Sequence, residues 1–200
     1  MEYLDKNYIN VNSDDTEIIE SFRTGNDQAF NHLVRKYQKR VYWVVRKMIS
    51  DHDDADDITQ EVFIRVYKSI NEFRGDSSFF TYLYRIAINL SLNFLNKRKR
   101  MNGKRADFDI EISKFESNES SAENLIDRPR NEKLFKSAIE QLPEQQRAVF
   151  VLRFYDNLTY DEISKILNRS VGGLKANYFH AVKKLQVILK PHLKDLSEAI

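Results

Sequence analysis

Apolar residues recur every three or four positions along most of this 200-residue chain, and this spacing constrains the fold more than any other feature. The pattern fills residues 27–96, stops in a polar stretch, and resumes over residues 131–196. A recurrence of three and four is typical of amphipathic helices, and only five glycines and three prolines are available to interrupt it. No stretch alternates as a strand does. The sequence therefore predicts an all-α protein with two small helical domains joined by a flexible linker.

Changes in composition place the domain boundaries. We expect an N-terminal tail over 1–19, a first helical domain over 20–97, a linker over 98–130 and a second helical domain over 131–196. The polar stretch begins with the basic string KRKRMNGKR and continues through acidic, serine-rich sequence. Such a segment has too little apolar surface to build a packed core.

Local signals place several helix ends. In the first domain, three helices are expected, with an optional fourth near residues 16–24. Asp51 to Asp54 offer an N-cap for the second of the three helices, and Ser77 or Ser78 offers one for the third. In the second domain, Pro143 suits the start of a helix over 144–155. Thr159 and Glu162 have the spacing of a capping box for a helix over 160–167, which a turn separates from a long helix over about 172–189.

Several classes of protein are excluded by residues that the chain lacks. It contains no cysteine, so disulfides and thiolate metal sites are ruled out. It has no glycine-rich phosphate loop and no hydrolase or metalloprotease motif. We expect a protein without cofactor or metal that is not an enzyme. The polar N-terminus is unlike a signal peptide and no apolar run could span a bilayer, which favours a cytoplasmic protein.

Charge is segregated along the chain. Residues 31–50 hold six basic residues and no acidic one, whereas residues 51–62 hold six acidic residues and no basic one. Solvated helix faces explain any single block. The alternation of blocks is better explained by a chain whose parts face different partners.

A helix-turn-helix is predicted over residues 158–185. The second helix would place Leu174, Tyr178 and Ala181 on one face. The opposite side would present Lys175, Asn177, His180, Lys183 and Lys184. A polar, positive face of this kind suits the DNA major groove, although spacing alone does not distinguish it from an ordinary helical hairpin.

Aromatic and basic residues are interleaved over residues 73–94. Six rings surround Arg74 and Arg85: Phe73, Phe79, Phe80, Tyr82, Tyr84 and Phe94. Rings that stack on bases and cations that meet phosphates are what single-stranded nucleic acid requires. The alternative is that the rings belong to the core, which we favour for Phe80 and Tyr84, whereas Phe79 and Tyr82 lie off the expected buried stripe.

The acidic string DHDDADDITQE begins at Asp51. A calcium loop would need glycine at its sixth position and glutamate at its twelfth, where this chain has Asp56 and Val62. An acidic helix face that docks on a basic protein and a merely solvated face both remain open.

The strings DDADDITQEVFIRVYKSINEFRGDSSFFTYLYRIAIN and LPEQQRAVFVLRFYDNLTYDEISKILNRSVGGLKANYFHAVKKLQ closely resemble the extracytoplasmic-function (ECF) group of bacterial RNA polymerase sigma factors. The resemblance implies a subunit that binds core RNA polymerase, recognises the minus-ten and minus-thirty-five promoter elements and nucleates DNA melting. The implied partners are the β′ clamp and β flap of core RNA polymerase, promoter DNA, and an anti-sigma factor, with no direct membrane insertion.

The resemblance also implies roles for individual residues. Docking on the β′ clamp is expected for Asp54, Asp57, Gln60, Glu61 and Phe63. A base flipped from the minus-ten element would enter a pocket in the loop from Arg74 to Thr81, and Tyr82 and Asn89 would help to separate the strands. The full minus-ten set is Arg74, Gly75, Asp76, Ser77, Phe79, Phe80, Thr81, Tyr82, Arg85 and Asn89. The minus-thirty-five set is Lys175, Ala176, Asn177, Phe179, His180 and Lys183.

The chain departs from the family pattern at the start of the expected recognition helix. Relatives usually show Val-Gly-Thr-Val-(Lys/Arg)-Ser-Arg, whereas residues 171–177 read VGGLKAN. The capping threonine and one arginine are absent, which predicts altered base preference and lower phosphate affinity. The rival hypothesis is a helix-turn-helix regulator that acts without polymerase core. A second rival hypothesis, from a different functional class, is a helical enzyme or metal-binding protein.

Overall fold

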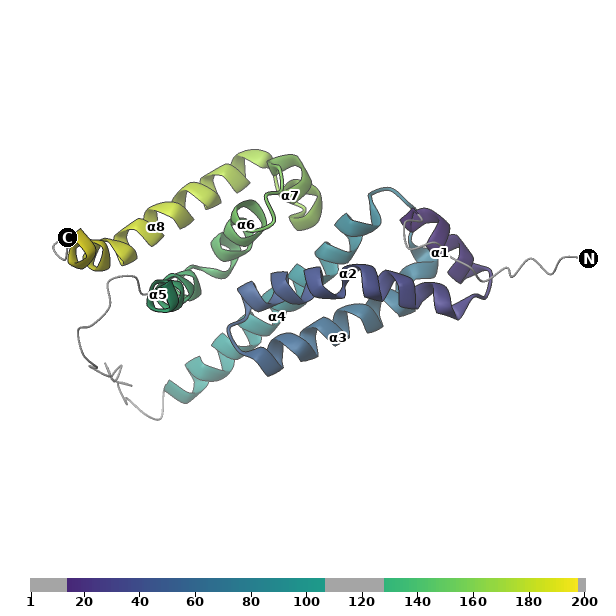
Figure 1. The fold of residues 1–200 in the computed structure, drawn as a ribbon, viewed down its shortest axis with the longest axis horizontal. Helices are drawn as coiled ribbons and strands as arrows, with labels where there is room; N and C mark the ends of the chain where they lie inside the picture. Colours follow the sequence, from purple (N-terminus) through teal and green to yellow (C-terminus); the bar gives the residue numbers. More distant parts are fainter. Residues whose placement is uncertain (1–13, 107–127, 198–200) are drawn as a thin grey trace, which may run out of the picture.

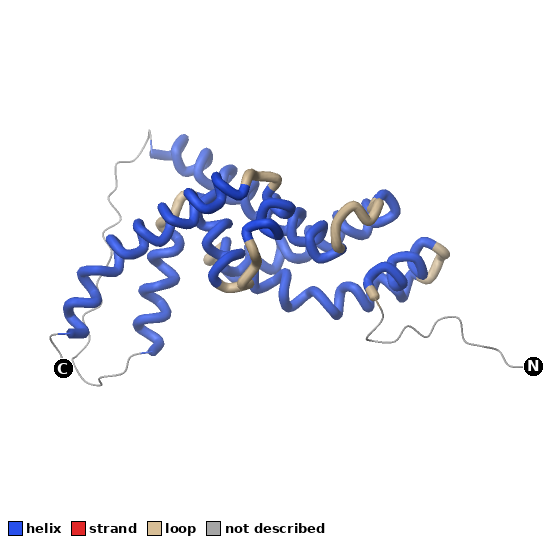
Figure 2. Tube along the Cα trace, turned by 90° about the horizontal axis from the view of Figure 1, so that it is seen from above, coloured by secondary structure: helices blue, strands red, loops and turns tan. Residues whose placement is uncertain are grey.

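The computed structural model describes residues 14–106 and 128–197, and every regular element within these ranges is a helix (Figures 1 and 2). In chain order the elements are α1 (Asp15–Arg23), α2 (Asp27–Met48), α3 (His52–Ser69), the 3-10 turn η1 (Ile70–Glu72), α4 (Phe79–Ala106), α5 (Arg128–Glu140), α6 (Glu144–Phe154), α7 (Tyr160–Leu167) and α8 (Val171–Ser197). The all-α prediction is confirmed. None of the described helices combines the length and apolar character that crossing a bilayer requires.

We call α1–α4 the first unit. The apolar face of α2 is buried: this helix places Ala29, Phe30, Leu33, Tyr37, Val41, Val44, Val45 and Met48 in the core. The optional helix near residues 16–24 is present as α1, and it covers one end of α2 with Ile18, Ile19 and Phe22. Burying these stripes against one another stabilises helices that would be marginal alone.

Side chains begin the helices where the sequence indicated. Asp51 accepts a hydrogen bond from the backbone amide of Asp54 at 3.0 Å and caps α3. Ser78 accepts from the amide of Thr81 at 3.2 Å at the start of α4. Thr159 and Glu162 form both hydrogen bonds of the capping box at α7, and Pro143 is the N-cap residue of α6.

We call α5–α8 the second unit. The helix expected over 160–167 has these bounds in the structure, and Asn168 ends it in the left-handed conformation with φ of 51°. A short asparagine side chain tolerates this conformation better than most residues do. The apolar face expected on α8 is buried at Leu174, Ala181 and Leu185.

Two helices extend into the segment that was expected to be linker. α4 continues to Ala106, past the expected boundary at residue 98, and α5 begins at Arg128, before the expected boundary at 131. Polar composition hid both extensions, because a solvent-exposed helix end needs no apolar stripe. The rest of the expected linker, 107–127, and most of the expected tail lie outside the described residues.

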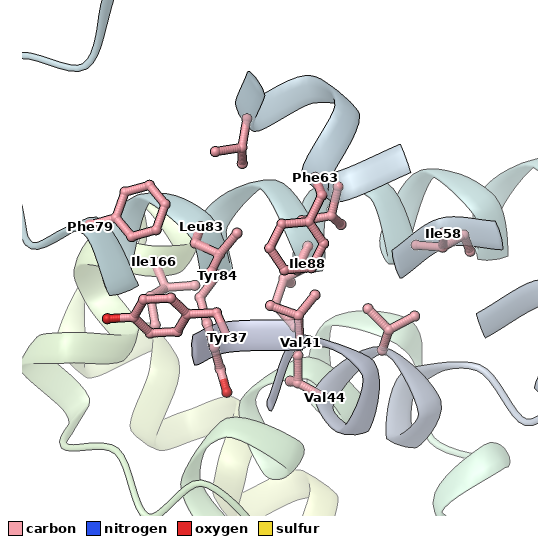
Figure 3. Close-up of a cluster of buried hydrophobic side chains, with 14 of the residues drawn as sticks. Tyr37, Val41, Val44, Ile58, Phe63, Phe79, Leu83, Tyr84, Ile88 and Ile166 are labelled. Carbon is pink, nitrogen blue, oxygen red and sulfur yellow. The ribbon is translucent and has the colours of Figure 1, made fainter. Parts of the chain in front are cut away.

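The two units pack against each other along a shared apolar core. Helices α6 and α7 lie against α2 and α4 (Figure 1), and Ile166 of α7 is buried in the same cluster as Leu83 and Tyr84 of α4 (Figure 3). Five consecutive apolar residues of α6, from Ala148 to Leu152, are buried. A helix buried on all sides must have neighbours on all sides, and α6 has α8 on one side and the first unit on another.

Candidate functional site

The acidic face of α3 is a solvent-exposed surface on the first unit. Asp57 and Gln60 are exposed, while Asp54 and Glu61 are half-buried at its edges. Asp51 stands at the N-terminus of the same helix, where the amide of Asp54 lowers the pKa of the Asp51 carboxyl. Carboxylates near a helix N-terminus are favoured by the helix dipole, so the start of α3 suits its acidic residues.

Basic residues of the same unit neutralise the edges of the acidic face but not its centre. Asp54 pairs with Arg98 of α4 at 3.6 Å, and Glu61 pairs with Arg65 at 2.7 Å. Asp57 forms no ion pair with any of the described residues. Phe63 lies in the core with 9% of its surface exposed, so it supports the helix from beneath.

An exposed aromatic residue of α2, next to the Tyr42 that contacts the start of α3, was not singled out from the sequence. Trp43 of α2 has 57% of its surface exposed and packs on Tyr42 with ring centroids 5.4 Å apart. The Tyr42 hydroxyl lies 2.8 Å from Nδ1 of His52, at the start of α3. An exposed tryptophan is a frequent anchor of protein interfaces. The exposure of Trp43 could not be predicted without knowing which face of α2 packs on the core.

The loop between η1 and α4 is held in a defined shape. Arg23 of α1 donates hydrogen bonds to the carbonyl oxygens of Ile70, Asn71 and Phe73. Gly75 has φ of +77°, with nothing near the position of a Cβ atom. Glycine is therefore required there by backbone conformation and not by crowding.

Phe79 is buried at 3% exposure, so the expectation that it lies off the buried stripe is wrong. Its ring contacts Phe73 of the loop, with centroids 6.0 Å apart. It also contacts Tyr37 of α2, with centroids 5.5 Å apart (Figure 3). The loop folds back over the first turn of α4, which buries a position that helical spacing alone would leave outside. Tyr82 is half-buried, and its hydroxyl forms a 2.6 Å hydrogen bond with Ser69.

The candidate minus-ten residues divide into an exposed group and a supporting group. The exposed residues are Arg74, Gly75, Asp76, Arg85 and Asn89; Ser77, Phe80 and Tyr82 are half-buried; and Phe79 and Thr81 are buried. Tyr84 is fully buried, as favoured from the sequence, and Phe80 packs on it with centroids 4.1 Å apart. The structure therefore presents a polar, basic rim on an aromatic base.

The predicted helix-turn-helix is formed by α7 and α8. Lys175, Ala176, Phe179, His180 and Lys183 are exposed on α8, and Asn177 is half-buried. Phe179, a large apolar side chain, has 62% of its surface exposed. The face that was assigned to the major groove is thus open to solvent.

The start of α8 has a cap that the sequence comparison missed. Ser170 accepts a hydrogen bond from the amide of Gly173 at 3.3 Å. A Cβ atom at Gly173 would stand 3.3 Å from the Ser170 hydroxyl oxygen. The absence of threonine at position 173 therefore does not leave the helix uncapped, because Ser170 supplies the cap.

Two charged residues at the contact between the units were also missed. Arg147 of α6 is buried and donates a 2.8 Å hydrogen bond to the carbonyl oxygen of Met48 in α2. Asp156, which follows α6, has a buried Oδ2 atom without a hydrogen-bond partner in the described structure. The unbroken apolar run around Arg147 was the available signal, since it implies a helix with neighbours on all sides.

Two family models match the chain. The model for Sigma-70 region 2 matches residues 33–101, and that for Sigma-70, region 4 matches residues 132–185. The chain is 33% identical over 189 residues to the RNA polymerase sigma-H factor of Pseudomonas aeruginosa, with 90% of this chain and 96% of that protein covered. It is 35% identical over 186 residues to the ECF RNA polymerase sigma-E factor of Escherichia coli, with the same coverage. The chain belongs to the ECF group of RNA polymerase sigma factors.

Solved structures agree with this sigma factor fold. The chain is similar to CnrH, solved in complex with the cytosolic domain of CnrY, with a TM-score of 0.63 and 20% identity over 88% of this chain and 97% of that one. It is similar to the sigma factor RpoE of Bartonella quintana, solved with the anti-sigma factor NepR, with a TM-score of 0.61 and 21% identity over 80% and 96%. As a sigma factor, the chain is a transcription initiation subunit and not an enzyme; it binds core RNA polymerase and directs it to promoter DNA.

The family matches coincide with the surfaces described above. The region 2 match contains the acidic face of α3 and the loop at residues 73–78, and the region 4 match contains α7 and most of α8. The rival of a helix-turn-helix regulator without polymerase is not favoured, since it would leave the region 2 match without a role.

Proposed function

We propose that the acidic face of α3 is the surface with which this sigma factor docks on core RNA polymerase. The exposed Asp57 and Gln60 would lie at its centre, with Asp54 and Glu61 at the edges. The observation that supports this assignment is that the exposed Asp57 forms no ion pair with any of the described residues, whereas Asp54 and Glu61 at the edges are paired. A basic partner surface, such as a positively charged part of the β′ clamp, would complete the pairing.

The loop at residues 73–78 and the exposed side of α4 are proposed to bind the melted minus-ten element. Arg74, Arg85 and Asn89 are exposed and can meet phosphates and base edges. Phe79 and Thr81 are buried in this structure, so we assign them to support of the loop and not to direct contact. Flipping a base out of the stack costs a few kcal/mol. Contacts of the base with the exposed residues of this loop and of α4 would offset that cost.

The exposed face of α8 is proposed to read the minus-thirty-five element. Lys175 and His180 would contact phosphates or base edges, and Asn177 could pair with adenine through two hydrogen bonds. Phe179 offers an apolar surface suited to a thymine methyl group. Because Asn177 replaces the arginine usual in relatives, we expect fewer phosphate contacts and a different base preference.

We also propose that an anti-sigma factor regulates this chain in the cytoplasm. Two structurally similar proteins were solved with a protein partner: the sigma factor RpoE with the anti-sigma factor NepR, and CnrH with the cytosolic domain of CnrY. Association with a protein partner would be detected by co-purification of the tagged chain from its own host.

Run-off transcription tests the proposed function directly. Core RNA polymerase and fragmented genomic DNA would be combined with and without the purified chain. We expect discrete new transcripts whose upstream sequences share two elements. If no transcript appears and the chain does not co-elute with core polymerase, the rival of a DNA-binding regulator without polymerase stands.

Asp57→Arg tests the docking face. We expect loss of binding to core polymerase with an unchanged helical spectrum, because the substitution reverses an exposed charge and breaks no ion pair of the described structure. Glu17→Arg, an exposed charge reversal on α1, is the matched control and should bind core normally. Retained core affinity in Asp57→Arg contradicts the assignment.

A further inference from the structure

The contact between the two units joins groups that promoter recognition would need apart. Arg85, an exposed residue of the candidate minus-ten rim, donates a 2.7 Å hydrogen bond to the carbonyl oxygen of Lys165 in α7. Arg147 and Lys136 of the second unit donate to the carbonyl oxygens of Met48 and Ser50 at the end of α2. We call this arrangement the closed form. It places part of the helix-turn-helix on α4.

A titratable group lies within this contact. Asp156, in the turn after α6, has its Oδ2 atom shielded from solvent, and the hydroxyl of the fully buried Tyr84 in α4 is shielded as well. Neither atom has a hydrogen-bond partner in the described structure. A buried charged oxygen without a partner is costly, and protonation removes most of that cost.

The groups that face Asp156 come from several elements. From α2, Arg40 and Lys47 lower its pKa. The Tyr84 hydroxyl of α4 faces the carboxylate without completing a hydrogen bond of normal geometry, and it also lowers the pKa of Asp156. Burial outweighs them and raises the pKa of Asp156 to about 6. Burial lowers the pKa of Lys47, and the negative charge of Glu132 in α5 partly opposes this shift.

The neighbouring cations are partly engaged elsewhere. The Lys47 ammonium lies 3.5 Å from the ring centroid of Tyr155. Burial raises the pKa of Tyr155. The Arg40 guanidinium lies 4.6 Å from the ring centroid of Phe80. Neither cation forms an ion pair with Asp156, which explains why the carboxylate stays undercompensated.

We propose that Asp156 is a proton-dependent latch that holds the second unit on α2 and α4. Acidification favours the closed form, because its buried carboxyl takes up a proton that an open, solvated Asp156 would not hold. Deprotonation leaves an incompletely compensated charge in the contact and favours opening. Opening frees Arg85, and this consequence for promoter binding rests on the proposed function.

The direction and size of the effect follow from the two protonation equilibria. A carboxyl with a pKa of about 6 in the closed form and about 3.9 in water binds more protons when closed at every pH between these values. The ratio of closed to open molecules therefore rises about tenfold between roughly pH 7.5 and pH 5.0. Above about pH 7 the ratio should be flat.

The distance between the units is the decisive measurement. The chain has no cysteine, so Lys68→Cys and Val187→Cys, both at exposed positions, accept one label each in the full-length protein. We expect the closed population, measured by energy transfer without polymerase or DNA, to grow as pH falls. A failure of the proposed function leaves this readout unaffected, so the two can be distinguished.

Asp156→Asn supplies the matched variant. Its neutral amide should keep the chain closed and insensitive to pH, whereas Asp161→Asn, an exposed change at the start of α7, should respond as the unmodified chain does. A population that does not change with pH in the unmodified chain overturns the proposal, as does an equal response in Asp156→Asn. If Asp156→Asn fails to fold, the titration of the unmodified chain still decides.

Discussion

Replacement of Arg147 tests whether a buried cation holds the two units together. Its guanidinium donates to the carbonyl oxygens of Met48 at 2.8 Å and Leu142 at 3.4 Å, and also to that of Glu140. Met48 belongs to α2, so this one side chain joins the first unit to the turn between α5 and α6. Burial lowers the pKa of Arg147, but the group remains charged at neutral pH.

The expected cost of Arg147→Met is the balance of two terms. Leaving the buried carbonyl oxygens of Met48 and Leu142 without donors costs about 1–3 kcal/mol each, with the longer bond to Leu142 at the low end. Relief of the buried charge, whose Nε atom has no partner in the described structure, returns part of this. We expect a net loss of about 2 kcal/mol in the free energy of unfolding.

Urea unfolding followed by circular dichroism measures this loss. The matched control is Lys136→Met, which removes an exposed donor to the carbonyl oxygen of Ser50 at 3.3 Å and should cost less than about 0.5 kcal/mol. If Arg147→Met is as stable as the unmodified chain or more stable, the buried cation does not stabilise the contact. In that case the apolar core alone holds the units together.

Three further predictions concern local features. Asn89→Ala should weaken promoter opening more than duplex binding, since Asn89 is exposed on α4; equal losses in permanganate footprinting and closed-complex affinity count against its role with the melted strand. Thr159→Ala should lower stability by about 1 kcal/mol in urea unfolding, because the amide of Glu162 loses its 3.3 Å acceptor, and Thr159→Ser should restore it. Gly75→Ala should cost about 1 kcal/mol through its φ of +77° alone, and an unchanged midpoint would show that the loop relaxes.

Much of the fold could be predicted because helical structure is encoded locally. The stripe of α2, the caps at Asp51 and Thr159, and the bounds of α7 follow from spacing and from side chains within a few residues of each helix end. The positions of the three candidate surfaces followed in the same way, since each lies on one helix or on one loop and the helix that follows it. The helical ends at Ala106 and Arg128 were missed because they are polar.

The division of the candidate site into contacting and supporting residues could not be predicted. Phe63 and Phe79 are side chains of the kind that bind partners, yet other elements cover both. Periodicity indicates which face of a helix is apolar. It does not indicate which loop or helix will fold over the neighbouring positions, because that depends on contacts between residues distant in the chain.

The sequence by itself determined that this chain is helical, where most helices begin, and that it belongs to the sigma factors. Only the tertiary structure decided that the two units share a core, that Arg147 joins them and that one oxygen of Asp156 is shielded from solvent. The physical reason is that burial and desolvation arise between elements far apart in the chain, whereas caps and amphipathic stripes arise within one element.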